Sequence, residues 1–410
     1  MDYSNQNIVG YKDSPLGIMP SDWEEMEFQQ FAEIIMGQSP EGNTYNKIGN
    51  GIALLNGPSE FTAKYPIKVQ WTTSPTKICK KDDILLCVRG SSTGRLNIAD
   101  EEYCIGRGVA AIRAKSNSIH SFLEFQIENI VSKILSLTTG STFPNIDSQS
   151  LRNIKISLPP LPEQYAIAAC LSTWDKAITS TTQLIAQKEL RKKWLMQQLL
   201  TGKKRLKGFS GEWKKISLSD IFDRVTRKND EKNTNVVTIS AQRGFVKQED
   251  FFNKIVASEI LDNYFLVEKG EFCYNKSYSN GYPWGATKRL NDFDKAVVTT
   301  LYICFQIKDE KNNLGDFFEQ FFEANLLDSG LTQIAHEGGR AHGLLNVTPN
   351  DFLNLKITIP SFKEQIAIAQ VLKAFDKENQ LLNTKLEKLK EQKKGLMQVL
   401  LTGKKRLKLK

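Results

Sequence analysis

The sequence lacks the motifs that mark most enzymes acting on nucleotides or nucleic acids. It contains no GxxxxGK[ST] phosphate loop, no GxGxxG segment and no HExxH zinc motif. The Asn-Pro-Pro-aromatic motif of DNA amino-methyltransferases is also missing, since residues 158–161 read Leu-Pro-Pro-Leu. We therefore predict a protein that binds its target and has no catalytic residues of its own.

Cysteine and histidine are scarce and scattered. The six cysteines form no CxxC pair, and the three histidines are too few and too far apart for a metal site. We expect buried, reduced cysteines in a cytoplasmic protein. The first fifteen residues lack a signal-peptide pattern, and no run approaches about 18 apolar residues, so we expect no membrane partner.

The composition is that of a globular protein with a basic excess. The chain has 410 residues, 40% hydrophobic and 25% charged, which allows two or three domains of ordinary size. Its 55 Lys and Arg residues outnumber 46 Asp and Glu residues, for a net charge of +9. This excess permits nucleic-acid binding but does not by itself indicate it.

One segment occurs twice. Residues 163–207 and 364–408 align without a gap, and 22 of the 45 aligned positions are identical. The separation of the two copies, 201 residues, is far longer than the roughly 20–50 residues of a solenoid repeat. The chain is therefore a duplicated module with an approximate internal two-fold repeat.

Both copies have the apolar spacing of a coiled coil, in steps of four and three residues. We call these positions the seam. In the first copy its apolar members are Ile167, Leu171, Trp174, Ile178, Ile185, Leu195 and Leu199. In the second copy they are Ile368, Leu372, Phe375, Leu382, Leu386, Leu389, Leu396 and Leu400. Polar residues occupy the remaining seam positions, among them Thr181 and Asn379.

The seam predicts two long helices, from about 162 to 200 and from about 361 to 401, with Gly202 and Gly403 as C-caps. Each helix would expose its apolar stripe if it stood alone, so we expect the two to pack along their length. The alternative is two unrelated amphipathic helices, each lying on its own domain. The shared length, register and terminus favour the pair.

The segments before the helices predict two α+β domains of about 150 residues. We place the domains at 1–157 and 208–358, and the helical regions at 158–207 and 359–410. Strands are expected at 84–88, 108–114, 236–240 and 297–307, and helices at 122–135 and 316–327. The two domains share residues at their boundaries and diverge between them.

Loops that follow predicted strands carry residues suited to DNA. Glycines allow close approach to phosphates, hydroxyls can bind phosphate oxygens, and arginines reach phosphates or guanine edges. The candidates in the first domain are Gln38, Ser39, Arg89, Ser91, Ser92, Thr93, Arg95 and Arg107. The candidates in the second domain are Lys276, Ser277, Tyr278, Tyr282, Arg340 and His342. Taken singly, each loop also fits an ordinary polar hairpin.

The chain resembles the specificity (S) subunit of type I restriction-modification enzymes. The features that carry the resemblance are the repeated block, which ends in Leu-Leu-Thr-Gly-Lys-Lys-Arg-Leu in both copies, and the segments at 81–94, 105–108, 277–285 and 300–305. The first copy begins with Pro-Leu-Pro-Glu-Gln, whereas the second has Phe362-Lys363 in place of Leu161-Pro162. The resemblance covers nearly the whole chain. It implies two mixed α/β target recognition domains separated by a pair of long antiparallel helices. Each domain would read one half of a bipartite site in double-stranded DNA.

The resemblance also implies the partners. Two methyltransferase (M) subunits would dock on the helices, and restriction and motor (R) subunits would complete the enzyme. S-adenosylmethionine, ATP and magnesium would be bound by those partners, with no cofactor in this chain. Two other functions remain open: a stand-alone bipartite DNA-binding regulator, and a coiled-coil scaffold that does not bind DNA.

Overall fold

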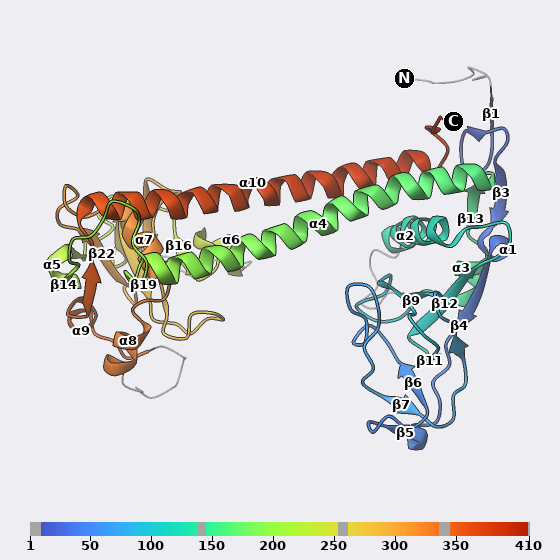
Figure 1. Ribbon diagram of the computed structural model, residues 1–410, viewed down its shortest axis with the longest axis horizontal. Coiled ribbons are helices and arrows are strands. Elements are labelled where there is room, and N and C mark those ends of the chain that lie inside the picture. The colour runs from blue at the N-terminus through green and yellow to red at the C-terminus, as the bar shows by residue number, and fades with distance from the viewer. Residues whose placement is uncertain (1–9, 138–144, 253–260, 336–344, 409–410) are drawn as a thin grey trace. The chain divides into compact units, whose positions relative to one another are not determined.

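The computed structural model describes residues 10–137, 145–252, 261–335 and 345–408. It divides into two compact units, Met1–Thr182 with Lys385–Lys410, and Gln183–Thr384. Each unit contains one α+β domain, half of helix α4 and half of helix α10 (Figure 1). The units therefore cut through both helices, whereas the sequence-based boundaries gave each helical region a segment of its own.

The first unit is built on a four-stranded antiparallel sheet in the order β10-β9-β12-β4, beside a second sheet in the order β5-β7-β6-β11-β8. The strands are β1 (Tyr11–Lys12), β2 (Met19–Pro20), β3 (Glu24–Glu27), β4 (Ala32–Met36), β5 (Tyr45–Asn46), β6 (Ile52–Leu55), β7 (Trp71–Thr72), β8 (Ile78–Cys79), β9 (Ile84–Cys87), β10 (Leu96–Ile98), β11 (Tyr103–Ile105), β12 (Val109–Ala114) and β13 (Lys155–Leu158). The helices are α1 (Phe28–Phe31), α2 (His120–Leu137), α3 (Ser148–Arg152) and α4 (Leu161–Leu199).

The second unit repeats the four-stranded antiparallel sheet, in the order β20-β19-β22-β15, and its other described sheets have two strands each. The strands are β14 (Lys214–Ser217), β15 (Phe222–Val225), β16 (Val237–Ser240), β17 (Gly244–Lys247), β18 (Phe265–Glu268), β19 (Phe272–Asn275), β20 (Ala286–Arg289), β21 (Lys295–Val298), β22 (Ile303–Ile307) and β23 (Lys356–Ile359). The helices are α5 (Leu218–Ile221), α6 (Gln248–Phe252), α7 (Gly315–Glu323), α8 (Asp328–Ile334), α9 (Pro349–Leu353) and α10 (Phe362–Leu400).

The two domains also have the same elements at their boundaries, which we call the frame. In each domain, a strand near its start and the last strand form a two-stranded antiparallel ladder, β3 with β13 and β14 with β23. The short helices α1 and α5 follow the first strand of each ladder, and both begin with a reciprocal capping box. The helices α3 and α9 precede the last strand, each N-capped by a side chain, from Asp147 and Thr348 respectively.

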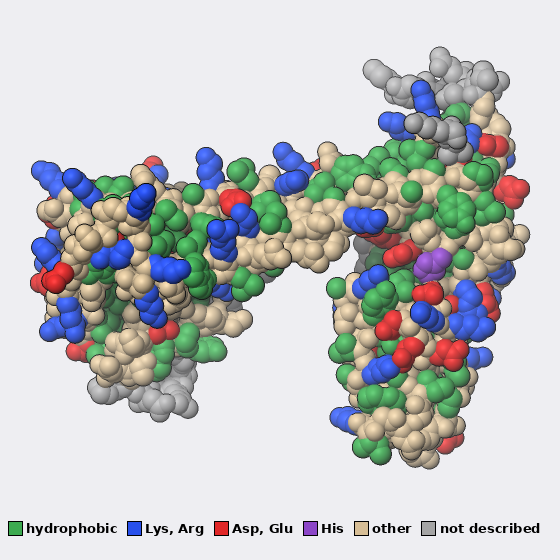
Figure 2. All heavy atoms as spheres, in the orientation of Figure 1, with side chains coloured by type: hydrophobic (Ala, Val, Ile, Leu, Met, Phe, Trp, Pro, Cys, Tyr) green, Lys and Arg blue, Asp and Glu red, His purple; other side chains and the backbone are tan. Residues whose placement is uncertain are grey.

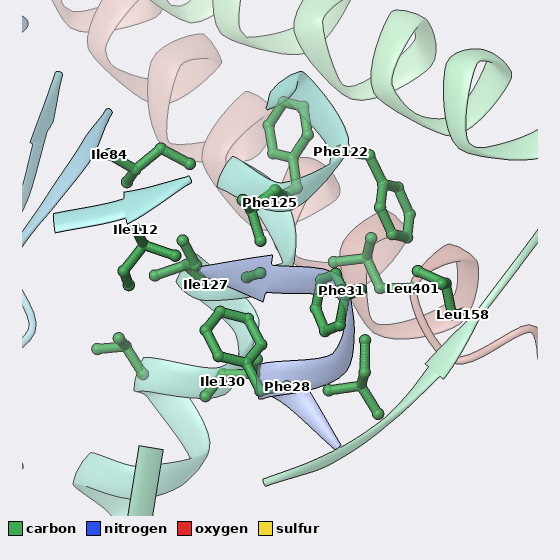
Figure 3. Packing of buried hydrophobic residues seen from close by; sticks show 14 of the residues in the cluster. Phe28, Phe31, Ile84, Ile112, Phe122, Phe125, Ile127, Ile130, Leu158 and Leu401 are labelled. Carbon is green, nitrogen blue, oxygen red and sulfur yellow. The ribbon is translucent and has the colours of Figure 1, made fainter. Parts of the chain in front are cut away.

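Each domain core is closed by the start of one long helix and the end of the other. In the first unit, Ile167 and Leu171 from α4 and Leu400 from α10 belong to the same core as Phe28 and Phe122. Figure 3 shows part of this packing, with Leu401 beside the phenylalanines of α1 and α2. The second core has the equivalent set.

The second core is dominated by phenylalanine. Helix α7 reads GDFFEQFFE, and its four phenylalanines are all buried. Phe222 lies edge-on to Phe272, Phe305 and Phe318 with ring centroids 5.0–5.7 Å apart. Leu199 from the end of α4 and Ile368 from the start of α10 complete the cluster.

Helices α4 and α10 are each 39 residues long, about 58 Å at 1.5 Å per residue. Within the first unit, Lys393 of α10 lies 2.8 Å from Asp175 of α4. Within the second unit, the equivalent Lys192 of α4 pairs with Asp376 of α10. The start of each helix thus lies beside the end of the other, and the predicted α+β fold with antiparallel long helices is confirmed.

The seam residues lie on the covered sides of the helices, and none of the fifteen is exposed. The buried ones are Ile167, Leu171, Ile185, Leu199, Ile368, Leu372, Leu386 and Leu400. The half-buried ones are Trp174, Ile178, Leu195, Phe375, Leu382, Leu389 and Leu396. Both helices are followed by a glycine in the left-handed region, Gly202 and Gly403, each at φ +70°, as expected for C-caps.

Two of the expected elements are wrong. The segment 297–307 is not one strand, because β21 ends at Val298 and the Tyr302 N–H donates to the Thr299 carbonyl in a tight turn. The helix expected at 316–327 ends at Glu323, and Asn325 adopts a positive φ of 55° before α8 begins. Continuous apolar periodicity hid both breaks.

A buried carboxylate joins the start of each long helix to the end of the other. Glu163, 1% exposed, accepts two hydrogen bonds from Arg406 and one of 2.9 Å from the Trp23 indole. Arg406 also donates to Asp22, and its hydrogen bonds to Glu163 and Asp22 raise the pKa of its guanidinium. We call this arrangement the helix junction.

The second unit has the same junction. Glu364, also 1% exposed, accepts two hydrogen bonds of 2.6 Å from Arg205 and one of 3.3 Å from Trp213. The adjacent glutamines repeat too, because Gln164 accepts from the Ile119 N–H before α2 and Gln365 accepts from the Leu314 N–H before α7. The repeated Glu-Gln pair thus fixes each helix start to its domain.

We expect Glu163→Gln and Glu364→Gln each to lower the free energy of unfolding by about 2 kcal/mol, because an amide cannot accept both Arg hydrogen bonds. Urea denaturation of the two variants measures this. Glu189→Gln, an exposed position on α4, is the matched control and should leave stability unchanged. If the two junction variants were as stable as the wild type and the control, the junctions would contribute nothing to stability.

Candidate nucleic-acid interface

The candidate residues of the first domain lie in loops at one edge of its main sheet. The register pairs Met36 with Ala110 and Cys87 with Val109, so β4 and β9 end where β12 begins. Strand β10 also starts at this edge, with Leu96 opposite Leu86. Three loops therefore meet there: residues 37–39, 89–95 and 106–108.

Gln38, Ser39 and Arg107 are brought together at this edge. The Ser39 hydroxyl accepts a hydrogen bond of 3.2 Å from the Arg107 N–H. The Gln38 N–H donates to the Ile105 carbonyl, and the Thr76 hydroxyl donates to the Gln38 carbonyl. The backbone is held in this way, while the side chains of Gln38 and Arg107 remain exposed.

The hairpin between β9 and β10 lies next to this pair of loops, because the Val88 N–H donates to the Gly108 carbonyl. Arg89 and Ser91 are exposed and Ser92 is half-buried. Gly90 and Gly94 both have positive φ, which lets the chain turn tightly. The segment also fits a GxSxG pattern, but it joins two antiparallel strands and so lacks the strand-to-helix setting of a catalytic serine.

Thr93 and Arg95 form hydrogen bonds within their own domain, although Arg95 is exposed. Thr93 is buried, and its hydroxyl donates to the Gly90 carbonyl. The Arg95 guanidinium donates to the carbonyls of Pro58 and Phe61, at 3.1 and 2.6 Å. These two side chains hold the hairpin and the 58–61 loop in place.

Arg113, which is half-buried, is also bound by groups of its own domain. It donates two hydrogen bonds of 2.7 Å to Asp83, and these raise the pKa of the guanidinium. In the second domain Arg227 binds Glu271. Glu271 directly precedes β19, just as Asp83 directly precedes β9. Each of these carboxylates also caps a turn, accepting from the N–H three residues earlier, that of Lys80 or Glu268.

The candidates of the second domain follow β19 at the equivalent edge. Tyr278 is 69% exposed, while Lys276 and Ser277 are half-buried. The Ser277 N–H donates to Asn275. Tyr282 is engaged within the domain, since its hydroxyl donates to Glu323 at 2.7 Å, and burial together with Glu323 raises its pKa. Arg340 and His342 lie outside the described residues.

Sequence reasoning missed Gln242 and Arg243 in the turn between β16 and β17. Both are exposed, and the Gln242 amide donates to the Asn280 carbonyl at the tip of the 277–282 hairpin. The Arg243 guanidinium lies over the Phe251 ring. The only sequence signal was an Arg-Gly pair after the strand expected at 236–240.

On the face shown in Figure 2, Lys and Arg side chains are interspersed with acidic ones. Among the described residues, no three His, Cys, Asp or Glu side chains come together as a metal site would require. In the same part of the chain, no helix has the length and apolar character needed to cross a membrane.

A family model described as the type I restriction modification DNA specificity domain matches residues 20–190 and again residues 210–391. The chain belongs to this family. It carries two specificity domains, and the predictions of a type I restriction-modification specificity protein and of a non-catalytic role are confirmed. We refer below to the first and second specificity domain.

Two specificity proteins from Methanocaldococcus jannaschii are similar to this chain. It is 42% identical over 200 residues to the putative type I restriction enzyme MjaX specificity subunit, covering 48% of this chain and 47% of that protein. It is 25% identical over 427 residues to the type I restriction enzyme MjaVIII specificity subunit, covering 95% and 94%. The chain thus spans about half of the first relative and nearly all of the second.

Two solved structures share the fold. The S subunit of a type I restriction-modification system from M. genitalium matches with a TM-score of 0.52 and 17% identity, covering 92% of this chain and 96% of that one. The HsdS subunit from Thermoanaerobacter tengcongensis matches with a TM-score of 0.50 and 15% identity, covering 94% and 98%. At these identities the likeness supports the architecture alone.

In the first specificity domain, variants of two different arginines should affect DNA binding and domain stability separately. We expect Arg107→Ala to weaken DNA binding without changing the melting temperature, because its side chain is exposed. We expect Arg95→Ala to lower the free energy of unfolding by roughly 1 kcal/mol, because two carbonyls lose their donor. Thermal melts and gel shifts of both variants test this, and the opposite pattern would reverse the assignment.

Proposed function

We propose that this chain is the specificity subunit of a type I restriction-modification complex, and that each specificity domain reads one half of a bipartite site in double-stranded DNA. The observation that carries the proposal is one strand order built twice, with unlike loops at the equivalent edge. The shared architecture gives the chain two DNA-reading domains, and their different loops let the two domains read different bases.

The loop chemistry supports DNA rather than a protein target. In the first domain, exposed Arg89, Arg107 and Gln38 lie on loops that hydrogen bonds between backbone groups hold together. Arginine and glutamine side chains are suited to base edges in the major groove, and Ser91 adds a hydroxyl for phosphate oxygens. A scaffold without DNA binding would have no need of such an edge in both domains.

The long helices are the proposed docking surface for two methyltransferase subunits. Helix α4 exposes large apolar side chains, including Tyr165, Leu190 and Trp194. Leu190 and Trp194 are four residues apart and so share one face of the helix. Exposed aromatic and aliphatic side chains of this kind are typical anchors of a protein interface.

The chemistry of the complex belongs, in this proposal, to its other subunits. The methyltransferase subunits bind S-adenosylmethionine, and the restriction and motor subunits use ATP and magnesium. The complex acts in the cytoplasm, where its DNA is found. A stand-alone regulator would differ by binding its site tightly without any methyltransferase, which a gel shift with and without that partner distinguishes.

Exchange of residues 32–119 for the equivalent segment of a foreign specificity domain should change only one half of the methylated motif. This segment contains the main sheet of the first unit and all candidate loops of the first domain. It leaves α2, whose Glu128 binds Lys393 of α10, and the helix junction intact. Methylome sequencing of cells carrying the chimera and its methyltransferase gives the motif directly. A change in both halves would contradict independent reading.

The double variant Leu190→Ser with Trp194→Ser should weaken methyltransferase binding by about tenfold or more, as expected for loss of a buried aromatic anchor. Calorimetric titration with the purified methyltransferase measures the affinity. Leu16→Ser, an exposed leucine of the first unit, is the control. Unchanged binding by the double variant would remove this face of α4 from the docking surface.

A further inference from the structure

The two specificity domains present an equivalent turn at the edge where the candidate loops meet. Strands β12 and β22 hold the same place in their sheets, because Ala111 pairs with Leu85 and Ile35 while Cys304 pairs with Cys273 and Val225. Each strand is preceded by a turn closed by one backbone hydrogen bond. These bonds run from Val109 to Gly106 at 3.0 Å and from Tyr302 to Thr299 at 3.2 Å.

The side chains on the two turns differ in kind. In the first domain a Cβ atom at Gly106 or Gly108 would collide with Asn56, so Arg107 between them carries the only side chain. In the second domain the turn reads Thr299-Thr300-Leu301 and has no charged residue. Leu301 takes the place of Gly108 and is 53% exposed.

Leu301 stands on a rigid support. Its N–H donates to the Thr299 hydroxyl at 3.3 Å. The next residue, Tyr302, is 8% exposed, and its hydroxyl shares a hydrogen bond of 3.0 Å with Thr238 and accepts one of 3.3 Å from the Ile239 N–H. A single exposed leucine is common on protein surfaces. This one is held in a defined position, in the turn where the first domain presents Arg107.

We propose that Leu301 reads a thymine in the second half-site by packing against its C5-methyl group in the major groove. This inference rests on the proposed function of the chain. Thymine is the only base with a methyl group at the major-groove edge, and apolar side chains recognise it by contact. The equivalent turns then read different bases, with a guanidinium in the first domain and an apolar side chain in the second.

Two other uses of the turn fit less well. The turn has no cation with which to bind phosphate strongly. Insertion of Leu301 between base pairs requires a side chain that projects freely. Nearly half of Leu301 is already covered by its own domain, whereas a contact with one methyl group needs only the exposed end.

The test uses the full chain with its methyltransferase subunits and a duplex carrying the methylated motif. Each thymine of the second half-site is replaced in turn by deoxyuridine, which removes only the methyl group. We expect one such replacement to weaken wild-type binding about fourfold, the effect of one buried methyl group. Leu301→Ala should bind the thymine duplex about fourfold more weakly and should no longer distinguish it from the deoxyuridine duplex.

The controls keep the outcome specific. Leu301→Met preserves an apolar side chain and should keep the preference for thymine. Leu16→Ala should behave as wild type, and deoxyuridine in the first half-site should affect Leu301→Ala and wild type equally. The inference is overturned if the second half-site contains no thymine, or if Leu301→Ala keeps the wild-type discrimination.

Insertion of the side chain has its own signature. A rise in 2-aminopurine fluorescence beside the second half-site that depends on Leu301 would replace methyl contact by unstacking, and would also overturn the inference. If the wild-type complex binds no specific duplex at all, the proposed function fails. If the complex binds its duplex specifically and Leu301→Ala has no effect, only this inference fails and the proposed function stands.

Discussion

Two buried carboxylates, Glu163 and Glu364, are the interactions on which the rest of the structure depends. Each lies at the start of a long helix and binds an arginine that follows the end of the other long helix. A buried carboxylate without a partner is strongly unfavourable, so the helix ends are obliged to meet. Because those same ends also close the two domain cores, helix pairing and domain folding are coupled.

This coupling explains why the two copies of the repeated block are so similar in sequence while the domains between them diverge. Glu, Gln and Arg in each block serve the junction, and the apolar residues beside them fill a core. The loops at the sheet edge belong neither to the junction nor to the core beside it. Their backbones are held by hydrogen bonds between main-chain groups, so residues such as Arg107 and Thr300 can change without cost to the frame.

Much of the frame could be predicted because its signals are local. The seam spacing and the terminal glycines predicted both long helices to within one residue at each end. The strands at 84–88 and 108–114 were also recognised, since short apolar runs between glycine-rich turns are typical of buried strands. The single strand expected at 297–307 failed, because its turn contains β-branched and apolar residues in place of glycine or proline.

The candidate site was less accessible to sequence reasoning. Arg95 and Arg107 look alike in the sequence and both are exposed, yet the Arg95 guanidinium is engaged by two carbonyls of its own domain. Gln242 and Leu301 gave no signal, because their relation to the other loops depends on contacts between residues 29 or more positions apart in the chain. Long-range pairing of this kind leaves no pattern in a local stretch of chain.

The sequence by itself determined the duplication, the long helices and the presence of two α+β domains, because periodicity and repetition are properties of the chain. Only the tertiary structure decided which helix end meets which, that Arg406 binds Glu163 and Arg205 binds Glu364, and which basic side chains remain free for a ligand. Those choices depend on burial and on the satisfaction of polar groups. Both arise only when residues far apart in the chain are packed together.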